Sequence, residues 1–520
     1  MSTKQIARAA STVMLAFLLS NVVGLIRQIV VSQAFGTSAA MDAFNAASRL
    51  PDLLFNLVAG GALGSAFIPV FTEFLVQGRR DDAWRLASAL SNLIALTLGL
   101  LSLLAAWAAE PIVARLLAPG FDPAQQALTV DLLRILLLSP TIFGLSGLTM
   151  GVLHSHQRFL WPALAPTMYW LGMIGGVLFL APRWGIYGLA WGAVLGSLGH
   201  WMVQWPALWR LPGRRYVLTL GWNIPAVRRV FRLMAPRWLG VAIVQLNFWI
   251  NVVLASGMPE GSLTAIQIAW AVMTMPQVVI AQAIAIAALP TFSAQVARGE
   301  WDALRTTLVQ TLRGVVLLAL PASVGLIVLR KPLIAALFQR GAFDQRSTEL
   351  VAWALLWYAL GLVSHSLVEI ASRAFYALKD TRTPVLIGSL AMSLNLGLSL
   401  LFARGFEAWG WPPHGGLALA NTLATTLEAF GLMLWLNRRL GQLPWRVLAR
   451  GFAASAVAAA GMAWVLLVLW PHLRAWPLWL ALGVAMFVGA LTYAGAVLAL
   501  ARPERQALQQ LIARYVARLR

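Results

Sequence analysis

Cysteine is absent from this sequence and charged residues are scarce. Of 520 residues, none is Cys and only 11% are Asp, Glu, Lys or Arg, whereas 60% are hydrophobic. Without cysteine there can be no disulfide framework, no thiol catalysis and no Cys-ligated metal site. A soluble domain has about 25% charged residues, so this chain has too few charges to cover a water-facing surface. These shortages exclude the soluble globular, disordered and nucleic-acid-binding classes.

Motifs for catalysis and for cofactor binding are also missing. The chain has no GxxxxGK[ST] loop that would bind the phosphates of ATP. Its six histidines are scattered, and none has the spacing of a metal-ligand set. We therefore expect a protein that is not an enzyme and that has no metal and no cofactor.

Long apolar runs are abundant instead. A spanning helix needs about 20 mostly apolar residues, and this criterion gives fourteen candidate spans. We therefore predict an all-α integral membrane protein with about fourteen transmembrane helices. The predicted spans cover residues 9–33, 43–75, 86–109, 128–152, 159–181, 186–208, 234–256, 264–294, 308–329, 348–372, 384–403, 415–437, 451–470 and 477–500.

The basic residues predict the orientation of these spans. The net charge is +21, from 39 Lys and Arg and 18 Asp and Glu. If the N-terminus is inside, 27 of the 39 cations fall at the inner ends and only 8 at the outer ones. Because positive loops remain in the cytoplasm, both termini are expected there, in a multi-pass protein of the bacterial cytoplasmic membrane. The positive charge thus marks a membrane face and gives no reason to expect a nucleic-acid partner.

The chain also repeats itself with an offset of 221–222 residues. Pro69-Val70-Phe71 is echoed by Pro290-Thr291-Phe292, and two further motifs recur at the same offset. Each copy holds six spans, so the copies enter the membrane in the same direction, as parallel lobes related by a pseudo-two-fold axis along the membrane normal. The predicted organisation is a six-helix lobe at 1–221, its repeat at 222–440, two extra helices at 441–501 and an amphipathic cytoplasmic tail at 502–520 that lies against membrane lipids.

A few ionisable side chains lie at membrane depth, where they usually face a cavity or a partner. Arg27 lies in the first span, and Asp42 and Arg49 lie two helical turns apart at the second. A cationic pocket suits a substrate that carries phosphates, so we predict substrate contacts at these positions. Two alternatives stay open: Arg27 could snorkel to the interface, and Asp42 could cap its own helix.

The second span contains residues that interrupt helices. Pro51 and the pair Gly60 and Gly61 fall inside the same apolar run. Broken or bendable helices are where transporters build sites and hinges. We therefore predict a hinge or gate at Pro51, Gly60 and Gly61.

Several motifs resemble those of the MurJ (MviN) family of lipid II flippases, in the MOP exporter superfamily. The resemblance runs from about residue 10 to 440, and its most specific element is the string from Phe375 to Pro384. The motifs are Gly24-Leu25-Ile26-Arg27, Phe35-Gly36, Asp42-Ala43-Phe44, Leu50-Pro51, Ala66-Phe67-Ile68-Pro69, Ala118-Pro119-Gly120-Phe121, Leu337-Phe338-Gln339-Arg340-Gly341-Ala342-Phe343 and Phe375-Tyr376-Ala377-Leu378-Lys379-Asp380-Thr381-Arg382-Thr383-Pro384.

The resemblance implies a two-lobe transporter that moves lipid II, or a related undecaprenyl-pyrophosphate-linked precursor, across the membrane by alternating access. It also implies coupling to an ion gradient or to the membrane potential, and a groove for the lipid tail at the two extra helices. Arg27, Asp42 and Arg49 match polar positions of the family. Family members commonly have arginine where this chain has Asn21, Phe55 and Ala271; Asn21 is counted with the predicted substrate contacts.

Two other functions stay open at this point. One is a MOP-type exporter of another lipid-linked oligosaccharide or of a drug. The other is a MurJ-like scaffold that does not transport. Lipid II flipping predicts that Arg27→Ala and Arg49→Ala abolish transport, whereas a scaffold predicts that both substitutions are silent. An exporter of another substrate predicts rescue of a different polysaccharide pathway.

Overall fold

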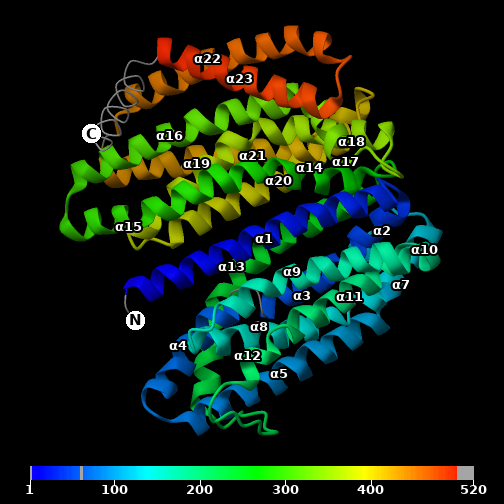
Figure 1. Ribbon diagram of the computed structural model, residues 1–520, viewed down its shortest axis with the longest axis vertical. Helices are drawn as coiled ribbons and strands as arrows, with labels where there is room; N and C mark the ends of the chain where they lie inside the picture. Colours follow the sequence, from blue (N-terminus) through cyan, green and yellow to red (C-terminus); the bar gives the residue numbers. More distant parts are fainter. Residues whose placement is uncertain (1–2, 59–61, 442, 501–520) are drawn as a thin grey trace. The chain divides into compact units, whose positions relative to one another are not determined.

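The computed structural model describes residues 3–58, 62–441 and 443–500, without the side chains of residues 3–15, 17, 57, 58, 62, 63, 65 and 236–244. Within these ranges every regular element is a helix (Figure 1), which confirms the predicted all-α class. The predicted hinge residues Gly60 and Gly61 and the predicted tail at 502–520 lie outside the described residues.

The chain forms two compact units. Unit 1 comprises Met1–Thr264 with Arg340–Asp344, and unit 2 comprises Ala265–Gln339 with Gln345–Arg520. These units group residues by contact rather than by sequence repeat, so the predicted domain boundaries stay a prediction. The helices of unit 1 are α1 (Thr3–Phe35), α2 (Ala39–Ala47), α3 (Arg49–Val58), α4 (Ala62–Val76), α5 (Arg80–Trp107), α6 (Ala109–Ile112), η1 (Val113–Leu117), α7 (Pro123–Leu136), α8 (Ser139–Ser155), α9 (Leu160–Gly175), η2 (Gly176–Leu180), α10 (Ala181–Trp184), α11 (Ile186–Met202), α12 (Trp205–Trp209), α13 (Pro225–Ser256) and the first turn of α14 (Ser262–Gln277).

Unit 2 continues from α14 to the end of the described chain. Its two C-terminal helices pack along α16 and α17 on a cluster that includes Met462, Leu466 and Leu482. Tyr493 Oη donates a hydrogen bond to the carbonyl oxygen of Leu317 at 2.8 Å, which ties the last helix to α16. The remaining helices of unit 2 are η3 (Val278–Gln282), α15 (Ala283–Arg298), α16 (Trp301–Val328), α17 (Arg330–Phe338), α18 (Gln345–Leu360), α19 (Leu362–Ala377), α20 (Arg382–Ala408), α21 (His414–Leu440), α22 (Trp445–Leu473) and α23 (Leu478–Leu500).

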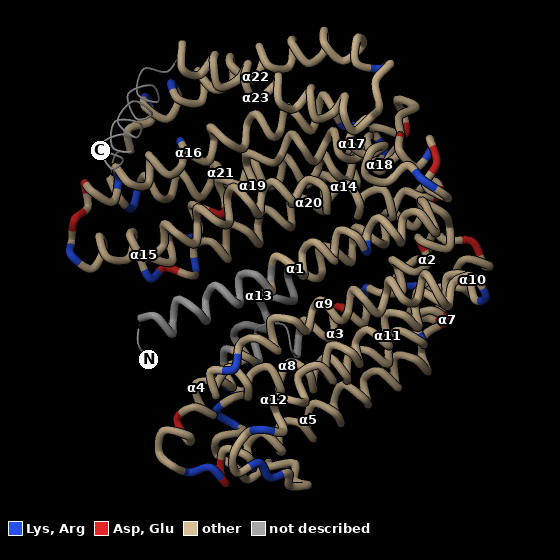
Figure 2. The backbone as a smooth tube through the Cα atoms, viewed as in Figure 1, with Lys and Arg blue, Asp and Glu red and all other residues tan. Residues whose placement is uncertain are grey.

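Ten helical segments in the described part of the chain are long and apolar enough to cross a membrane, or eleven if the bent pair α18 and α19 is one span. The ten segments and the bent pair together correspond to eleven of the fourteen predicted spans. The other three fall on α2–α4, which is broken, on α11, which has only 17 residues, and on α13, whose side chains are partly undescribed. In Figure 2 the charged residues of each unit gather at helix ends, as a membrane environment requires.

The helices recur at the spacing of the sequence repeat. Both α5 and α16 have 28 residues, and they begin 221 positions apart, at Arg80 and Trp301. The preceding helices carry an internal proline, Pro69 in α4 and Pro290 in α15. Each is followed by a glycine in the left-handed region, at φ +74° for Gly78 and +70° for Gly299. A residue with a side chain would be strained there, so glycine ends the helix in both copies.

In unit 1 α9 and α11 pack closely because glycines face one another. Gly172 and Gly176 on α9 and η2 face Gly192 and Gly196 on α11, all at four-residue spacing. Small residues at this spacing let helix backbones approach, which is a common basis of packing between membrane helices. A Cβ atom added at Gly172 would lie 2.2 Å from the Cα atom of Gly196. The space between the helices therefore cannot hold a methyl group.

Gly172→Ala is expected to lower the stability of unit 1, because the new methyl group must push two backbones apart. Overpacking of this kind costs about 1–3 kcal/mol. Gly175→Ala, on the same helix, is the matched control, since its Cβ would meet only Phe179 Cδ2, at 4.0 Å. Thermal unfolding of the detergent-purified variants measures the difference. A Gly172→Ala protein as stable as the control would contradict the close packing.

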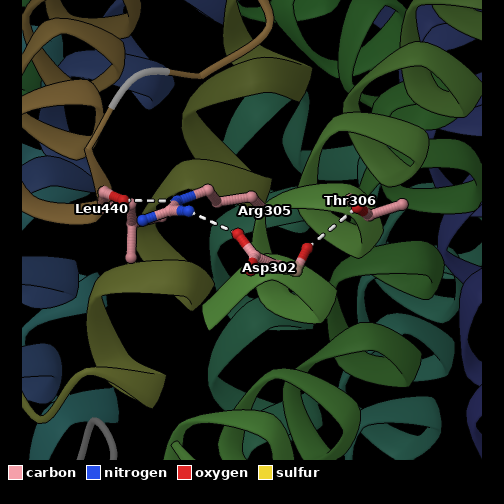
Figure 3. Close-up of polar contacts among 4 residues, drawn as sticks. All are labelled: Asp302, Arg305, Thr306 and Leu440. Atoms are coloured by element: carbon pink, nitrogen blue, oxygen red, sulfur yellow. Dashed lines mark hydrogen bonds and ion pairs between the residues drawn. The ribbon is translucent and has the colours of Figure 1, made fainter. Parts of the chain in front are cut away.

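In unit 2 an arginine joins the start of α16 to the end of α21. Arg305 Nε donates a hydrogen bond to the carbonyl oxygen of Leu440, and its Nη1 pairs with Asp302 Oδ1 at 2.6 Å (Figure 3). Asp302 also accepts, through its carbonyl oxygen, the hydroxyl of Thr306 at 2.9 Å. A cation at a helix C-terminus satisfies a carbonyl that the helix leaves free. This contact holds two sequence-distant helices of the unit at one end.

The string from Phe375 to Pro384 forms the turn between α19 and α20. Lys379 takes the left-handed conformation, at φ +59°. The Asp380 carboxylate then accepts bonds from the backbone N–H and the hydroxyl of Thr383, at 3.1 and 2.7 Å. These bonds, with a smaller contribution from Arg439, hold the pKa of Asp380 below its ordinary value. The most specific resemblance motif therefore forms the start of α20.

Candidate functional site

Arg27 lies on α1 beside two aromatic residues of α9. Its Cζ is 4.6 Å from the centroid of the Trp170 ring, a cation–π contact. Its charge also interacts with Tyr169. Arg27 Nε is buried and has no hydrogen-bond partner among the described residues. A guanidinium group with an unsatisfied hydrogen-bond donor is suited to bind an anion.

The next two charged groups come from α3. Arg49 and Asp52 are three residues apart, so they share one face of the helix. The Arg49 Cζ lies 5.6 Å from the ring centroid of Phe248, on α13. Asp52 interacts electrostatically with Arg49 and with Tyr169. Tyr169 therefore interacts with the cation of α1 and with the carboxylate of α3.

We call Arg27, Arg49, Asp52, Tyr169 and Trp170 the polar cluster. The sequence predicted its two arginines but missed Asp52, Tyr169 and Trp170. Asp52 could have been found, because it follows Arg49 at helical spacing and comes directly after Pro51. The aromatic pair had no such signal, since Trp and Tyr are frequent throughout membrane proteins.

A phenylalanine occupies one position where the family commonly has arginine. The rings of Phe55 and Phe143 lie 5.0 Å apart, and Phe143 lies 5.0 Å from Tyr169 and 5.2 Å from His200. These distances are typical of stabilising aromatic pairs. Phe55 and Phe143 thus form an aromatic cluster next to Tyr169, and Phe55 occupies the position where the family commonly has a cation. Ala271, another such position, lies on α14 and accepts a bond from Thr274 Oγ1 through its carbonyl oxygen, at 3.0 Å.

Asp42 has a different environment from the two arginines. Its carboxylate is 3% exposed and accepts the backbone N–H of Gly261 and of Thr264, each at 2.8 Å. It also accepts the Thr264 hydroxyl at 2.5 Å. These donors lie at the first turn of α14, where four N–H groups lack partners within the helix. Asp42 therefore caps α14, and it does not cap its own helix, since the N-cap of α2 is Ser38.

The other predicted positions have clear locations as well. Asn21 lies on α1 with an exposed side chain, almost two turns before Arg27. Pro51 is buried in the first turn of α3, directly after the break at Ser48 that separates this helix from α2. Their roles in substrate binding and in gating stay predictions. In the described residues no group of three His, Asp or Glu is placed to hold a metal ion.

Unit 2 contributes an apolar groove of about 400 Å³. It runs between α14, α16 and α17 on one side and α22 and α23 on the other. Its walls are formed almost entirely by aliphatic and methionine side chains, among them Met275, Leu326, Leu333, Met462 and Met486. Such a lining fits a hydrocarbon chain.

Two solved transporter structures share this fold. A structure described as lipid II flippase MurJ in an inward closed conformation matches 94% of this chain and 99% of its own, with a TM-score of 0.80 and 23% identity. An inward-facing multidrug resistance MATE family transporter of the MOP superfamily matches 81% and 94%, with a TM-score of 0.66 and 18% identity. The chain therefore has the fold of these transporters.

Sequence comparison identifies the family within this class. The family described as lipid II flippase MurJ matches residues 31–482. The lipid II flippase MurJ of Burkholderia cenocepacia is 32% identical over 489 residues, which cover 91% of this chain and 92% of that protein. A probable lipid II flippase MurJ of Bdellovibrio bacteriovorus is 30% identical and covers 88% and 87%. The chain belongs to the MurJ family.

Proposed function

We propose that this protein moves lipid II from the cytoplasmic to the outer leaflet of the bacterial cytoplasmic membrane. The observation that carries the proposal is the polar cluster, which places two arginines on the apolar helices α1 and α3 of unit 1. Burying such charges is costly unless a partner compensates them. A pyrophosphate group is a partner of suitable charge, because guanidinium groups bind phosphate oxygens in a bidentate manner.

Each residue of the cluster has a distinct part in this proposal. Arg27 and Arg49 bind the pyrophosphate, and Trp170 holds the Arg27 guanidinium by stacking on it. Asp52 competes with the substrate for Arg49, so that the cation is partly neutralised when the site is empty. Tyr169 and the neighbouring phenylalanines offer aromatic faces to the sugars.

The groove of unit 2 would hold the undecaprenyl chain while the head group crosses the membrane. Transport proceeds by alternating access, as a secondary-type process coupled to an ion gradient or to the membrane potential. The sequence has no GxxxxGK[ST] loop, which supports transport that ATP does not drive directly. With both termini in the cytoplasm, the arginines near the start of α13, Arg228, Arg229 and Arg232, face the anionic inner leaflet.

Complementation tests the function directly. Expressed in a bacterium depleted of its own MurJ, this protein is expected to restore growth and normal cell shape. A parallel assay in liposomes measures how much lipid II becomes accessible in the far leaflet. A well-expressed protein that restores neither would overturn the proposal, and rescue of a different polysaccharide pathway would favour another lipid-linked substrate.

A further inference from the structure

A charged pocket lies at the end of unit 1 where α4 turns into α5, outside everything assigned so far. It has a volume of about 580 Å³, and α4, the first turns of α5 and the start of α13 line it. Its charged side chains are Glu73, Arg79, Asp82, Arg85 and Arg229, and Figure 2 shows both signs of charge at this end of the unit. We call it the inner-end pocket, because the predicted orientation places this end in the cytoplasm.

The walls of the inner-end pocket are joined by bonds outside the pocket itself. The chain that precedes α13 runs along α5, where Ser88 Oγ accepts the backbone N–H of Val217 at 3.1 Å. One turn further on, Asn92 Nδ2 donates to the carbonyl oxygen of Thr219 at 2.8 Å. Gly221 is in the left-handed region, at φ +62°, and a side chain there would collide with α5. The start of α13 is thus fixed on α5, and a preformed pocket lowers the entropy cost of binding.

Four of the five charges form two pairs that a ligand can exchange. Arg79 Nη2 is 2.8 Å from Asp82 Oδ2, and Arg229 Nη1 is 2.8 Å from Glu73 Oε2. The four side chains are 44–57% exposed, and ion pairs at such sites contribute little to stability. A carboxylate of a ligand can therefore replace the protein carboxylate on either arginine. An amine of the ligand can then bind the carboxylate that is released.

The fifth charge, Arg85, has no such pair. It is exposed on the second turn of α5 and makes no hydrogen bond or ion pair with another residue in the described part of the chain. Arg79 is held in place on its other side by Phe74, since its Cζ lies 4.7 Å from the centroid of that ring. Three arginines and two carboxylates leave the pocket with one net positive charge. The pocket thus favours a ligand that carries both signs of charge, with carboxylates in excess.

This requirement separates a peptide from other charged groups near the membrane. A pyrophosphate carries negative charge alone, so Glu73 and Asp82 would repel it. A zwitterionic phospholipid carries one phosphate and one amine, so it leaves the excess arginine without a partner. The head group of a peptidoglycan precursor includes a short peptide with several carboxylates and an amine, which matches both signs and the excess. Val70, Ile224 and Pro225 add an apolar wall for small side chains of such a peptide.

We propose that the inner-end pocket binds the peptide of the transported precursor, with Arg85 and Arg229 on its carboxylates and Glu73 or Asp82 on its amine. The inference rests on the proposed function, and it adds a contact that recognises the peptide to the pyrophosphate contact at the polar cluster. On the cytoplasmic side the pocket meets the precursor before transport. It therefore selects lipids whose peptide is present over those that lack it.

Binding to the full-length protein in detergent tests the pocket with two lipids. One is lipid II, and the other is undecaprenyl diphosphate that carries the same sugars without the peptide. The wild type is expected to bind lipid II about tenfold more tightly, a gain that one or two charge-assisted bonds provide. Arg85→Gln with Arg229→Gln should lower the affinity for lipid II to that for the peptide-free lipid, whose own affinity stays unchanged. Arg158→Gln, an exposed cation in the turn between α8 and α9, is the matched control and should change neither.

A change in the ligand gives a second test on the unaltered protein. Lipid II whose peptide carboxylates are amidated keeps its pyrophosphate and its sugars but loses the negative charges of the peptide. It should bind the wild type about as weakly as the peptide-free lipid does. Because no residue is exchanged, altered folding cannot account for this result.

The outcomes separate the inference from the proposed function. The inference would be overturned if the double exchange weakened both lipids equally or neither, or if the amidated lipid bound with full affinity. Loss of the tenfold preference in the presence of phosphatidylethanolamine would also overturn it, since the occupant would then be a bulk phospholipid. Equal binding of both lipids that still depends on Arg27 and Arg49 would leave the proposed function standing alone. A protein that binds and flips neither lipid would overturn the proposed function and the inference with it.

Discussion

Arg27→Ala is expected to abolish lipid II transport without reducing the amount of folded protein. The Arg27 guanidinium contacts Trp170 and has a buried donor, Nε, with no partner among the described residues. The fold therefore loses little when it is removed. A hydrogen bond to a charged group contributes about 1.5–3 kcal/mol, so loss of a bidentate phosphate contact should slow transport by about a hundredfold or more. Lipid II flipping in liposomes and rescue of MurJ-depleted cells measure the effect.

Two comparisons make this result specific. Arg27→Lys keeps the charge but loses the planar contact with Trp170 and the bidentate geometry, so an intermediate rate is expected. Arg134→Ala is the matched control, because Arg134 is exposed and paired with Glu110 at 3.2 Å, away from the polar cluster. If Arg27→Ala transported lipid II at the wild-type rate, Arg27 would be an interface anchor. If neither protein transported lipid II, the hypothesis of a non-transporting scaffold would be favoured.

Asp42→Ala is expected to destabilise the protein by about 3 kcal/mol. The change leaves the N–H groups of Gly261 and Thr264 and the Thr264 hydroxyl without their acceptor. Each buried donor left unsatisfied costs about 1–3 kcal/mol. Asn45 Nδ2, which donates to Thr264 Oγ1 at 2.9 Å, would lose part of its support as well. Asp42→Asn should cost less, because the amide keeps one oxygen acceptor.

Thermal unfolding in detergent, together with the liposome assay, decides between two roles for Asp42. A capping residue should lower the unfolding temperature first and transport only as a consequence. Asp81→Asn provides the control, since Asp81 is exposed in the first turn of α5, outside the polar cluster. Loss of transport at unchanged unfolding temperature in Asp42→Ala would mean that the carboxylate acts on the substrate instead.

The arginines of the site could be found from the sequence, because the free-energy cost of placing a cation in an apolar run depends only on its neighbours in the chain. A cation in an apolar run stands out wherever its partners are, and Arg27 and Arg49 did so. Asp52 was within reach by the same reasoning, three residues after Arg49. Tyr169 and Trp170 were not, because only the packing of α9 against α1 brings them to Arg27. Asp42 was recognised as polar, but its partners lie about 220 residues later in the chain.

The sequence by itself determined the class of this protein. Scarce charge, long apolar runs and a repeat at 221 residues leave an all-α membrane fold, because backbone polar groups in lipid must be satisfied within helices. The tertiary structure alone decided which charges meet, which glycines face each other, and where an apolar groove lies. These properties depend on contacts between helices far apart in sequence, and local hydrophobic patterning carries no information about such pairings.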